Sequence, residues 1–336
     1  MDKNSNLKIG VIGSGSWATA MIKILTDNSS LKEILWWVRK EEHVDFIREY
    51  KHNPNYLTAV EVKIKPEHIS SDIRDVVRQS DIVILNTPAA YLHSALSGIS
   101  PSDLANKTIV SAIKGIVPEE NLVVGEYLMQ HYNVADDHIV VIGGPCHAEE
   151  VAQERLSYLT FACHQESRAA RVADLFLTRY IQAITSTDTM GIEYGAVLKN
   201  IYAVASGICH GLGYGDNFQA VLVSNAIREM ELFVKKLDTR QREIKASAYL
   251  GDLLVTTYSQ FSRNRTFGNM IGRGYSIQSA QSEMNMVAEG FYASGCIQKI
   301  TERYQLQLPI CNMVYEVLYN KKPARAEVAR LAQDFT

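Results

Sequence analysis

Short apolar runs, each followed by a longer amphipathic stretch, repeat along the first half of the chain. The runs are continuous and rich in β-branched residues, and they span residues 7–13, 33–38, 81–88, 108–115, 138–145, 157–163 and 180–187. Continuous apolar runs are typical of strands buried on both faces, and helices between successive strands favour parallel pairing. The pattern therefore predicts an α/β fold with a doubly wound, mostly parallel sheet.

The pattern changes near residue 189. From there on, small and apolar residues recur at helical spacing, in residues 191–213, in residues 217–237 and again after residue 285. No strand pattern of comparable strength follows. We therefore expect a first domain at residues 1–189 and an all-helical second domain at residues 190–336.

Length and composition agree with a two-domain globular protein. The chain has 336 residues, which is more than one hydrophobic core usually serves. Hydrophobic residues make up 46%, charged residues 21%, and the net charge is −3. This balance argues against nucleic acid or an anionic membrane surface as a partner. No apolar run reaches the roughly 18 residues that span a bilayer.

The spacing of the cysteines and histidines and the composition of the first residues bear on the cellular compartment and on metal binding. The five cysteines are widely spaced without a C-x-x-C pair, and the nine histidines lack metal-type spacing. The first residues, MDKNSNLKIG, lack the apolar core of a signal peptide. We expect a cytoplasmic protein that contains neither a disulfide nor a bound metal.

The hexapeptide G-S-G-S-W-A at residues 13–18 joins the first apolar run to an amphipathic stretch. In such a turn Gly13 permits the tight bend, Gly15 lets the backbone approach a pyrophosphate, and the small Ala18 lets helix and strand pack closely. Ser16 and Trp17 open the helix, whose N-terminus would face the anion. The motif is weak alone, but here it starts a series of strand–helix units. It predicts a Rossmann-type domain that binds a dinucleotide; a turn without a ligand is the alternative.

The end of the second apolar run bears on the choice of cofactor. An NAD-selective site usually carries an acidic residue there, which binds the ribose 2′-hydroxyl. This run ends instead in Val38-Arg39-Lys40. The Arg39 guanidinium suits the 2′-phosphate of NADP, although it is equally compatible with a solvated charge. The cofactor is therefore expected to be NADP or NAD.

Separated motifs occur in one order along essentially the whole chain. They are GSGSWATA (13–20), SAIKG (111–115), GGPCHAEE (143–150), GAVLKN (195–200), LGDLLVTT (250–257), SRNRTFG (262–268), VAEG (287–290) and CNMVYEVLY (311–319). In this ordered set the sequence resembles the bacterial type of NAD(P)-dependent glycerol-3-phosphate dehydrogenase. The resemblance implies an oxidoreductase that couples dihydroxyacetone phosphate and sn-glycerol 3-phosphate by hydride transfer, feeding phospholipid synthesis. A small-molecule substrate and a homodimer are implied with it.

The resemblance places three charged residues at the reacting oxygen. Reducing a ketone leaves negative charge on that oxygen, which a positioned cation or acid must stabilise and protonate. Lys199 lies in an apolar helix, where partial burial would lower its pKa; a lysine that reaches the surface is the alternative. Lys114 follows the apolar run at residues 108–115 and could face both nicotinamide and substrate, or be an ordinary loop lysine. Asp252 would keep Lys199 charged and oriented, a role compatible with that of an N-cap.

A second set suits the substrate phosphate. Ser262, Arg263 and Asn264 combine a planar cationic fork with neutral donors ahead of a helix. The resemblance implies that this set contacts the phosphate and that Arg263 also approaches the cofactor; a solvated basic loop is the alternative. Val287 and Glu289 match cofactor contacts, although Glu289 also reads as a surface glutamate.

One turn departs from the family pattern. The usual Ser-Gly-Pro-Thr-Phe-Ala is G-G-P-C-H-A at residues 143–148, so Cys146 cannot make a hydroxyl contact. Gly144 is still expected to contact substrate and Ala148 to contact cofactor. His147 in this turn has no readable partner, and His210 lies in a glycine-rich bend, so neither joins the catalytic set.

Two other functions stay open from the sequence. The first is another Rossmann dehydrogenase with a helical second domain, of the 3-hydroxyacid or 6-phosphogluconate type, but that group lacks the joint LGDL and SRNR motifs. The second is a non-catalytic dinucleotide sensor. Loss of Lys199 or Asp252 would mark a sensor, and both residues are present.

Overall fold

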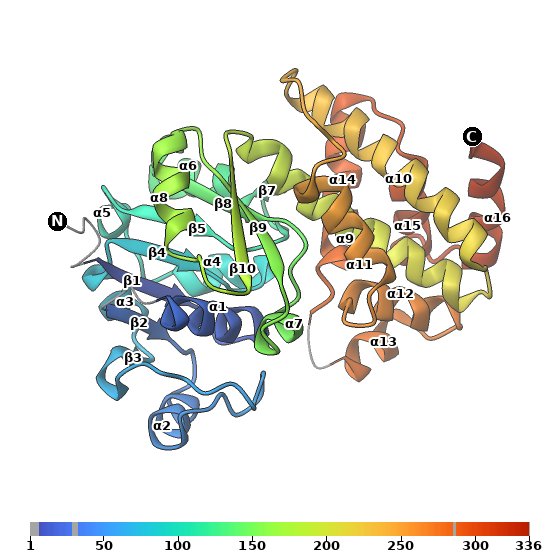
Figure 1. The fold of residues 1–336 in the computed structure, drawn as a ribbon. Helices are drawn as coiled ribbons and strands as arrows, with labels where there is room; N and C mark the ends of the chain where they lie inside the picture. The colour runs from blue at the N-terminus through green and yellow to red at the C-terminus, as the bar shows by residue number, and fades with distance from the viewer. Residues whose placement is uncertain (1–6, 29–32, 285–286, 336) are drawn as a thin grey trace. The chain divides into compact units, whose positions relative to one another are not determined.

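The chain forms two compact units in a computed structural model that describes residues 7–28, 33–284 and 287–335. The first unit takes in the described residues up to 113 together with 124–189. The second takes in residues 114–123 and the described residues from 190 onward. Figure 1 shows the strands of the first unit in blue and green and the helices of the second in yellow to red.

Eight strands of the first unit form one sheet, in the order β10-β9-β8-β5-β4-β1-β2-β3. Their bounds are β1 Lys8–Ile12, β2 Glu33–Trp37, β3 Ile69–Ser70, β4 Ile82–Leu85, β5 Thr108–Ser111, β8 Ile139–Gly143, β9 Ser157–Ala162 and β10 Ile181–Ser186. Each of the seven apolar runs contributes a strand, which confirms the predicted α/β class. Only β3 escapes prediction, because two residues are too few to show a period.

Helices connect these strands. They are α1 Ser16–Asp27, α2 Glu41–Tyr50, α3 Ile73–Gln79, α4 Leu92–Leu96, α5 Pro101–Leu104, α6 Val124–Tyr132, α7 Ala148–Ala152 and α8 Glu166–Asp174. Among the described residues, no helix of either unit is both long and apolar enough to cross a bilayer.

The sheet is mixed at one end. β8 and β9 pair antiparallel, with Val141 opposite Ala162, whereas β10 runs parallel to β9. Residues 144–156 connect β8 to β9, and within them α7 is a helix of only five residues. The connection therefore lacks the long crossover helix that usually joins parallel strands, in keeping with the antiparallel direction of β9.

The expectation that all strands are buried on both faces is wrong for β10. This strand lies at the edge of the sheet, and Ile184 on it is 42% exposed. Only one side of an edge strand is paired with a neighbour, and helices cover less of it. An apolar composition therefore does not by itself report burial at a sheet edge.

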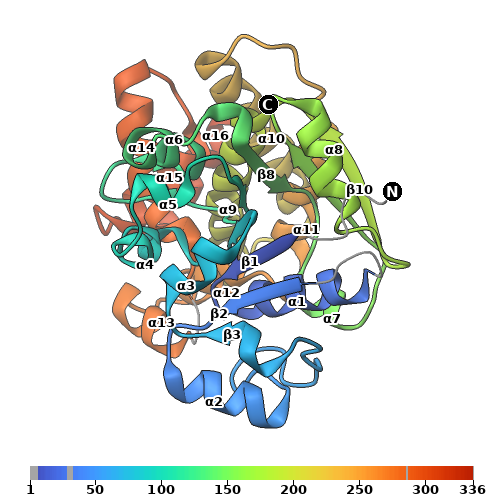
Figure 2. The ribbon, with the colours of Figure 1, turned by 90° about the vertical axis from the view of Figure 1, so that its left-hand side faces the viewer.

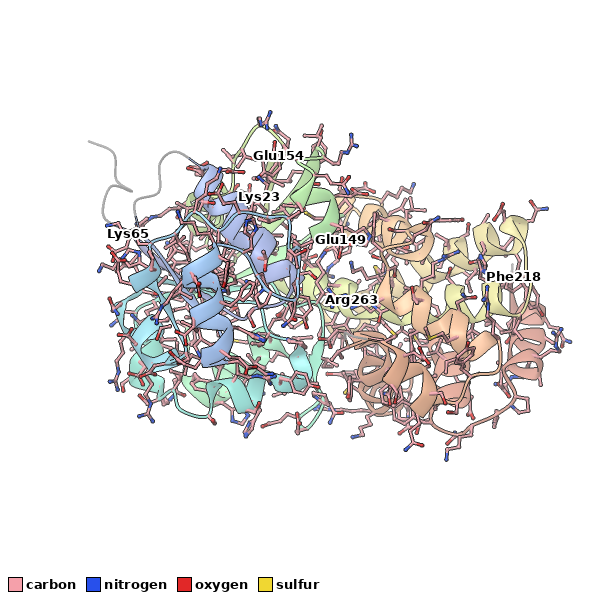
Figure 3. The ribbon with its side chains drawn as sticks, turned by 90° about the horizontal axis from the view of Figure 1, so that it is seen from below. Lys23, Lys65, Glu149, Glu154, Phe218 and Arg263 are labelled. Atoms are coloured by element: carbon pink, nitrogen blue, oxygen red, sulfur yellow. The ribbon has the colours of Figure 1, made fainter. Side chains whose placement is uncertain are left out.

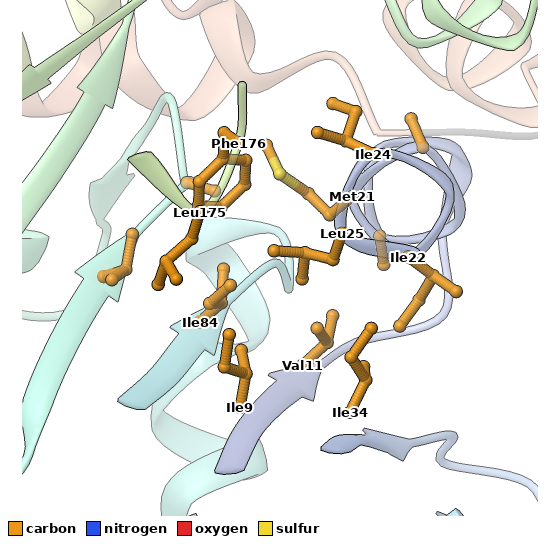
Figure 4. Packing of buried hydrophobic residues seen from close by; sticks show 14 of the residues in the cluster. Ile9, Val11, Met21, Ile22, Ile24, Leu25, Ile34, Ile84, Leu175 and Phe176 are labelled. Atoms are coloured by element: carbon orange, nitrogen blue, oxygen red, sulfur yellow. The ribbon is translucent and has the colours of Figure 1, made fainter. Parts of the chain in front are cut away.

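The core of the first unit follows from the two-residue period of its strands. Ile9 and Val11 of β1 point toward α1 and pack with Met21 and Leu25, as Figure 4 shows. Gly10 between them faces the other side, where an added Cβ would lie 3.1 Å from Val76 of α3. In Figure 2, α1 and α3 accordingly lie on opposite faces of the sheet around β1 and β2.

A charged contact holds α1 against the segment that follows α7. Lys23 Nζ lies 2.7 Å from Asp27 and 2.8 Å from Glu154, and the three form a partly buried cluster. Lys23 and Glu154 are both labelled in Figure 3. This contact fixes the helix that begins at the glycine-rich turn.

In the second unit the long segments are helical, which confirms the expected all-helical C-terminal region. The helices are α9 Thr189–Gly211, α10 Asp216–Leu237, α11 Asp252–Tyr258, α12 Arg263–Gly272, α13 Ile277–Glu283, α14 Glu289–Tyr304, α15 Pro309–Leu318 and α16 Ala324–Asp334. A small hairpin of β6 (Ile116–Val117) and β7 (Leu122–Val123) belongs to this unit and contacts α14.

Helices α9 and α12 cross at backbone contact. A Cβ on Gly207 would lie 2.1 Å from the Arg265 carbonyl oxygen, and one on Gly268 would lie 2.1 Å from that of Val204. No side chain fits between these helices at that point, so glycine is required on both. The crossing fixes the start of α12 relative to the middle of α9.

Candidate functional site

The turn between β1 and α1 depends on glycine in two different ways. Gly13 has φ +130°, and an added Cβ would lie 2.9 Å from the backbone carbonyl of Asn86. Gly15 has an ordinary φ of −79°, and nothing lies within 4 Å of the position of its Cβ. Gly13 is therefore required by the fold itself. Gly15 leaves open space beside the backbone, as a turn that receives a ligand would.

Two side chains outside the motif hold this turn. Trp36 Nε1 donates to the Gly13 carbonyl oxygen at 2.7 Å, and Asn53 Nδ2 donates to that of Ser14 at 3.0 Å. Sequence reasoning missed both. Trp36 reads as one more apolar strand residue, and Asn53 lies in a loop without a recognisable motif.

The start of α1 has no side-chain cap. Gly15 is its N-cap, no side chain caps the helix, and no acidic residue occurs in its first turn. Ser16 is buried, and Trp17 Nε1 is buried without a hydrogen-bond partner among the described residues. Ala18 is fully buried in the core beneath the turn. A helix N-terminus that carries neither a side-chain cap nor an acidic residue suits a phosphate group, so these residues fit a dinucleotide pyrophosphate.

Beyond β2, the carboxylates nearest to Arg39 in sequence are occupied. Glu42 pairs with Lys40 at 3.0 Å, and Glu41 accepts a hydrogen bond from the Ser71 hydroxyl. Arg39 is exposed and forms no ion pair with the residues that the structure describes. Its guanidinium is therefore available to an anionic ligand.

The atypical turn after β8 again needs glycine. Gly144 has φ +97°, and a Cβ there would lie 2.8 Å from the Tyr158 carbonyl oxygen. Cys146 packs against the hydrophobic core, His147 is the N-cap of α7, and Ala148 is its buried first residue.

In the second unit three charged residues from distant parts of the sequence form one buried ion cluster. Asp252, 1% exposed, accepts from Lys114 at 2.9 Å through one carboxylate oxygen and from Lys199 through the other. Lys199 is 5% exposed, so the alternative of a lysine that reaches the surface is wrong. The N-cap role for Asp252 is wrong too, because Gly251 caps α11 and no side-chain cap bond is made.

Two further polar residues complete this cluster, and sequence reasoning did not single them out. Lys199 donates to Thr256 Oγ1 at 3.0 Å, and that hydroxyl donates to the Asp252 carbonyl oxygen at 2.6 Å. Asn200 Nδ2 donates to the Lys114 carbonyl oxygen at 2.6 Å. The signal was present, since Thr256 is four residues after Asp252 on a helix and Asn200 is next to Lys199.

Burial and charge act against each other in this cluster. Desolvation, reinforced by neighbouring Lys114, lowers the pKa of Lys199 to about 7, although Asp252 opposes the shift. For Asp252, desolvation raises the pKa, but the two ammonium groups outweigh it and the net pKa is lowered. The carboxylate therefore stays charged, while Lys199 can exchange a proton near neutral pH.

The start of α12 gathers the second predicted set. The Ser262 hydroxyl caps the helix by accepting from the Arg265 N–H at 3.3 Å. Asn264 is buried and its Oδ1 accepts from the Gly290 N–H at 2.9 Å. Arg263, labelled in Figure 3, is partly exposed and forms no ion pair with the described residues.

These two clusters are joined through the first turn of α14. A Cβ on Gly290 would lie 2.5 Å from the Asn200 carbonyl oxygen, while the Gly290 N–H donates to Asn264. Glu289 is the first residue of α14, and Val287 lies just before its N-cap, both partly exposed. His210 is an exposed residue in the last turn of α9 and lies in neither cluster.

Two family models match the chain. The model described as NAD-dependent glycerol-3-phosphate dehydrogenase N-terminus matches residues 8–169, and the one described as the C-terminus of the same enzyme matches residues 188–329. Together they cover both units of the structure.

Individual proteins agree with this match. A glycerol-3-phosphate dehydrogenase (NAD(P)+) of Agathobacter rectalis is 32% identical over 326 residues, covering 96% of this chain and 95% of the relative. A second such enzyme, from Salinibacter ruber, is 34% identical over 317 residues, covering 94% and 91%. The crystal structure of glycerol-3-phosphate dehydrogenase from Coxiella burnetii has the same fold, with a TM-score of 0.90 at 24% identity over 97% of this chain and 99% of that one.

The two glycines of the β1–α1 turn give a matched pair of variants. Gly13→Ala forces a side chain into a backbone conformation and a contact that exclude it, so we expect a loss of about 1–3 kcal/mol in unfolding free energy. Gly15→Ala meets neither obstacle and should unfold like the wild type, but its methyl group should weaken dinucleotide binding. Urea unfolding and a titration of NADPH fluorescence measure the two effects. Unchanged affinity in Gly15→Ala would contradict a ligand at this turn.

Proposed function

Because the chain belongs to the NAD-dependent glycerol-3-phosphate dehydrogenase family, we propose that it interconverts dihydroxyacetone phosphate and sn-glycerol 3-phosphate with NADP or NAD. Its product would supply phospholipid synthesis. The buried cluster of Lys114, Asp252 and Lys199 carries the proposal, since ketone reduction needs positive charge and a proton at one oxygen. Oxidation of NADPH and of NADH with dihydroxyacetone phosphate, beside 3-hydroxyacid substrates as controls, tests it.

We assign the roles unit by unit. Residues 1–189, apart from 114–123, would form the dinucleotide-binding domain, and residues 190–336 together with 114–123 the substrate and catalytic domain. In the first unit the cofactor residues are Gly13, Gly15, Ser16, Trp17, Arg39 and Ala148, and Gly144 is a substrate residue. In the second unit the substrate residues are Lys114, Lys199, Asp252, Ser262, Arg263 and Asn264, and the cofactor residues are Lys114, Arg263, Val287 and Glu289.

The reacting oxygen would be served by the lysine cluster. Bound NAD(P)H supplies the hydride when the ketone is reduced. Lys199 then gives its proton to the oxygen as negative charge develops there, and the Lys114 ammonium stabilises that charge. Asp252 holds both ammonium groups in place, and Thr256 fixes the orientation of Lys199. In the reverse direction the neutral Lys199 amine takes the proton from the alcohol.

The phosphate end would be held at the start of α12. Arg263 offers a planar cationic fork that no carboxylate of the described residues neutralises. Ser262 uses its oxygen as a helix cap, which leaves the hydroxyl proton for the phosphate. Asn264 gives its carbonyl oxygen to Gly290, so its amide nitrogen stays available as a donor.

The other functions considered from the sequence are less well supported. A 3-hydroxyacid type would not need the α12 phosphate set. A 6-phosphogluconate type would need a phosphate site, but it lacks the joint LGDL and SRNR motifs that this chain carries at residues 250–253 and 262–265. A non-catalytic sensor would have no use for a lysine whose pKa is lowered to about 7 by burial. Wild-type turnover of dihydroxyacetone phosphate separates all three functions.

We also propose a homodimer and a cytoplasmic location. The exposed apolar side chains of Leu254, Tyr258 and Phe261, at helical spacing on and just after α11, support association with a second copy. The five cysteines, none of which forms a disulfide with a described residue, support a reducing compartment.

The pKa of Lys199 predicts opposite pH dependences for the two directions. Ketone reduction starts from the ammonium form of Lys199, so its kcat/KM should fall as the pH rises through about 7. Alcohol oxidation starts from the amine form, so its kcat/KM should rise over the same pH range. Asp252→Asn removes the negative charge that raises the pKa of Lys199, so the pH transitions of kcat/KM in both directions should move to lower pH. Initial rates from pH 5.5 to 9 measure them.

The control for this titration is Lys199→Met, which should fold and bind cofactor but lose about 10²–10³ in kcat, the usual effect of removing one donor to a developing oxyanion. Near-wild-type turnover in this variant would show that another group donates the proton.

Arg263 is predicted to anchor the phosphate. Arg263→Ala should raise KM for dihydroxyacetone phosphate by roughly 10–100-fold, the effect of losing a charge-assisted bidentate pair, and Arg263→Lys should restore only part of this. Dihydroxyacetone, which lacks the phosphate, should be affected little by either variant. An unchanged KM in the alanine variant would exclude this role.

Arg39 is predicted to make NADPH at least as good a cofactor as NADH, because Glu42 pairs with Lys40 and Glu41 with Ser71, which leaves the Arg39 guanidinium to a 2′-phosphate. Arg39→Asp should shift kcat/KM toward NADH by adding like-charge repulsion. The matched control is Lys40→Asp, which changes the charge equally one residue further on. A strong wild-type preference for NADH that Arg39→Asp leaves unaltered would refute the assignment.

A further inference from the structure

The carboxyl end of β4 is followed by two residues, Asn86 and Thr87, with buried polar side-chain atoms. Asn86 Nδ2 and Oδ1 and Thr87 Oγ1 form no hydrogen bond with the residues that the structure describes. Thr87 is 9% exposed, and Asn86 is buried at its amide although the residue as a whole is partly exposed. Buried polar groups normally find a partner, and those that do not destabilise the fold. Two such residues in succession therefore call for a ligand that is bound in the working protein.

Their position in the sheet suggests which ligand. The Asn86–Thr87 peptide packs directly on Gly13, because a Cβ on Gly13 would lie 2.9 Å from the Asn86 carbonyl and 3.2 Å from the Thr87 nitrogen. β4 is the strand next to β1 on the side away from β2. A dinucleotide in this fold crosses the sheet at the point where the strand order reverses, which here lies between β1 and β4.

The two halves of the dinucleotide then fall on different strands. The adenosine half lies over β1 and β2, where Arg39 follows the end of the strand. The other half lies over β4 and β5, where Asn86 and Thr87 are. The Asn86 amide and the Thr87 hydroxyl are therefore on the nicotinamide side of the β1–α1 turn.

The chemistry of an amide matches that half. A carboxamide presents a donor and an acceptor side by side, so it can donate to one hydroxyl oxygen and accept from a neighbouring hydroxyl. The two adjacent hydroxyls of a ribose are such a pair. The nicotinamide ribose keeps both in NAD and in NADP, whereas the adenosine ribose of NADP does not.

We propose that Asn86 and Thr87 bind the nicotinamide ribose, the Asn86 amide pairing with its two hydroxyls and the Thr87 hydroxyl adding a third hydrogen bond. This binding requires the side chain of the partly exposed Asn86 to rotate, because both of its amide atoms are buried. The assignment rests on the dinucleotide cofactor of the proposed function and adds two residues to its site.

Binding measurements on the full chain test the assignment. In Asn86→Leu the affinity for whichever of NADH and NADPH binds more tightly should fall roughly tenfold, as expected for two neutral hydrogen bonds. Thr87→Val should lose roughly threefold to tenfold. Isothermal titration with the matching fragment, ADP or 2′,5′-ADP, should give wild-type affinity in both variants, because the fragment lacks the nicotinamide ribose.

Stability separates this role from a structural one. Removing an orphaned polar group should leave the melting temperature of the ligand-free protein unchanged or raise it. The matched control is Thr108→Val at the amino end of β5, which makes the same chemical change at a residue that is also 9% exposed. Thr108 accepts from Arg168 at 2.8 Å, so this variant should melt earlier and bind cofactor normally.

Three results would overturn the assignment. They are unchanged cofactor affinity in Asn86→Leu, an equal loss of fragment affinity, or a lowered melting temperature in both β4 variants. Failure of the proposed function is distinguishable, because it would appear as wild-type protein that binds the dinucleotide without reducing dihydroxyacetone phosphate.

Discussion

The chemistry of the helical unit depends on one buried carboxylate. Asp252 is almost completely removed from water, and an isolated charge there would be strongly destabilising. Lys114 and Lys199 compensate it, but two cations on one anion leave the cluster with a net positive charge when both are protonated. Such a cluster is electrostatically complete only when a further negative charge arrives. In the proposed reaction a developing oxyanion would supply that charge, so an arrangement that is unfavourable in the resting protein would be favourable in the transition state.

The rest of the helical unit holds this cluster in place relative to Ser262, Arg263 and Asn264, the residues proposed to bind the phosphate. Helices α9 and α12 are in backbone contact at Gly207 and Gly268, so neither helix can move closer to the other. Gly290 then links the two sets, since it packs on Asn200 and donates to Asn264. A substrate with an oxygen and a phosphate a few bonds apart needs two binding sets with a fixed spacing. Rigid helices meeting at glycine provide it more precisely than loops could.

The first unit also contains locally unfavourable features next to a proposed ligand site. Gly13 adopts a conformation that other residues avoid, and beside it the side chains of Asn86 and Thr87 find no hydrogen-bond partner among the described residues. Core packing of Ile9, Val11 and the surrounding strands stabilises the fold enough to tolerate them. Both units therefore show polar groups whose arrangement is incomplete without a ligand, a common feature of binding sites.

The sequence by itself determined the elements and the candidate chemistry. Strand runs, helical periods and the glycine turn are local patterns, and they led to the α/β sheet, the helical region and the residues Lys114, Lys199 and Asp252. Only the tertiary structure decided which of these residues meet, because Lys114 and Asp252 are 138 positions apart and no local pattern records their contact. It also decided that β9 runs antiparallel to β8 and that β10 is half exposed at an edge. Only in the packed chain do Trp36 and Asn53 bond to the β1–α1 turn and Thr256 to Lys199, while the Asn86 amide is left without a partner among the described residues. Burial and pairing are properties of the packed chain, so the lowered pKa of Lys199 could be assigned only after the fold was known.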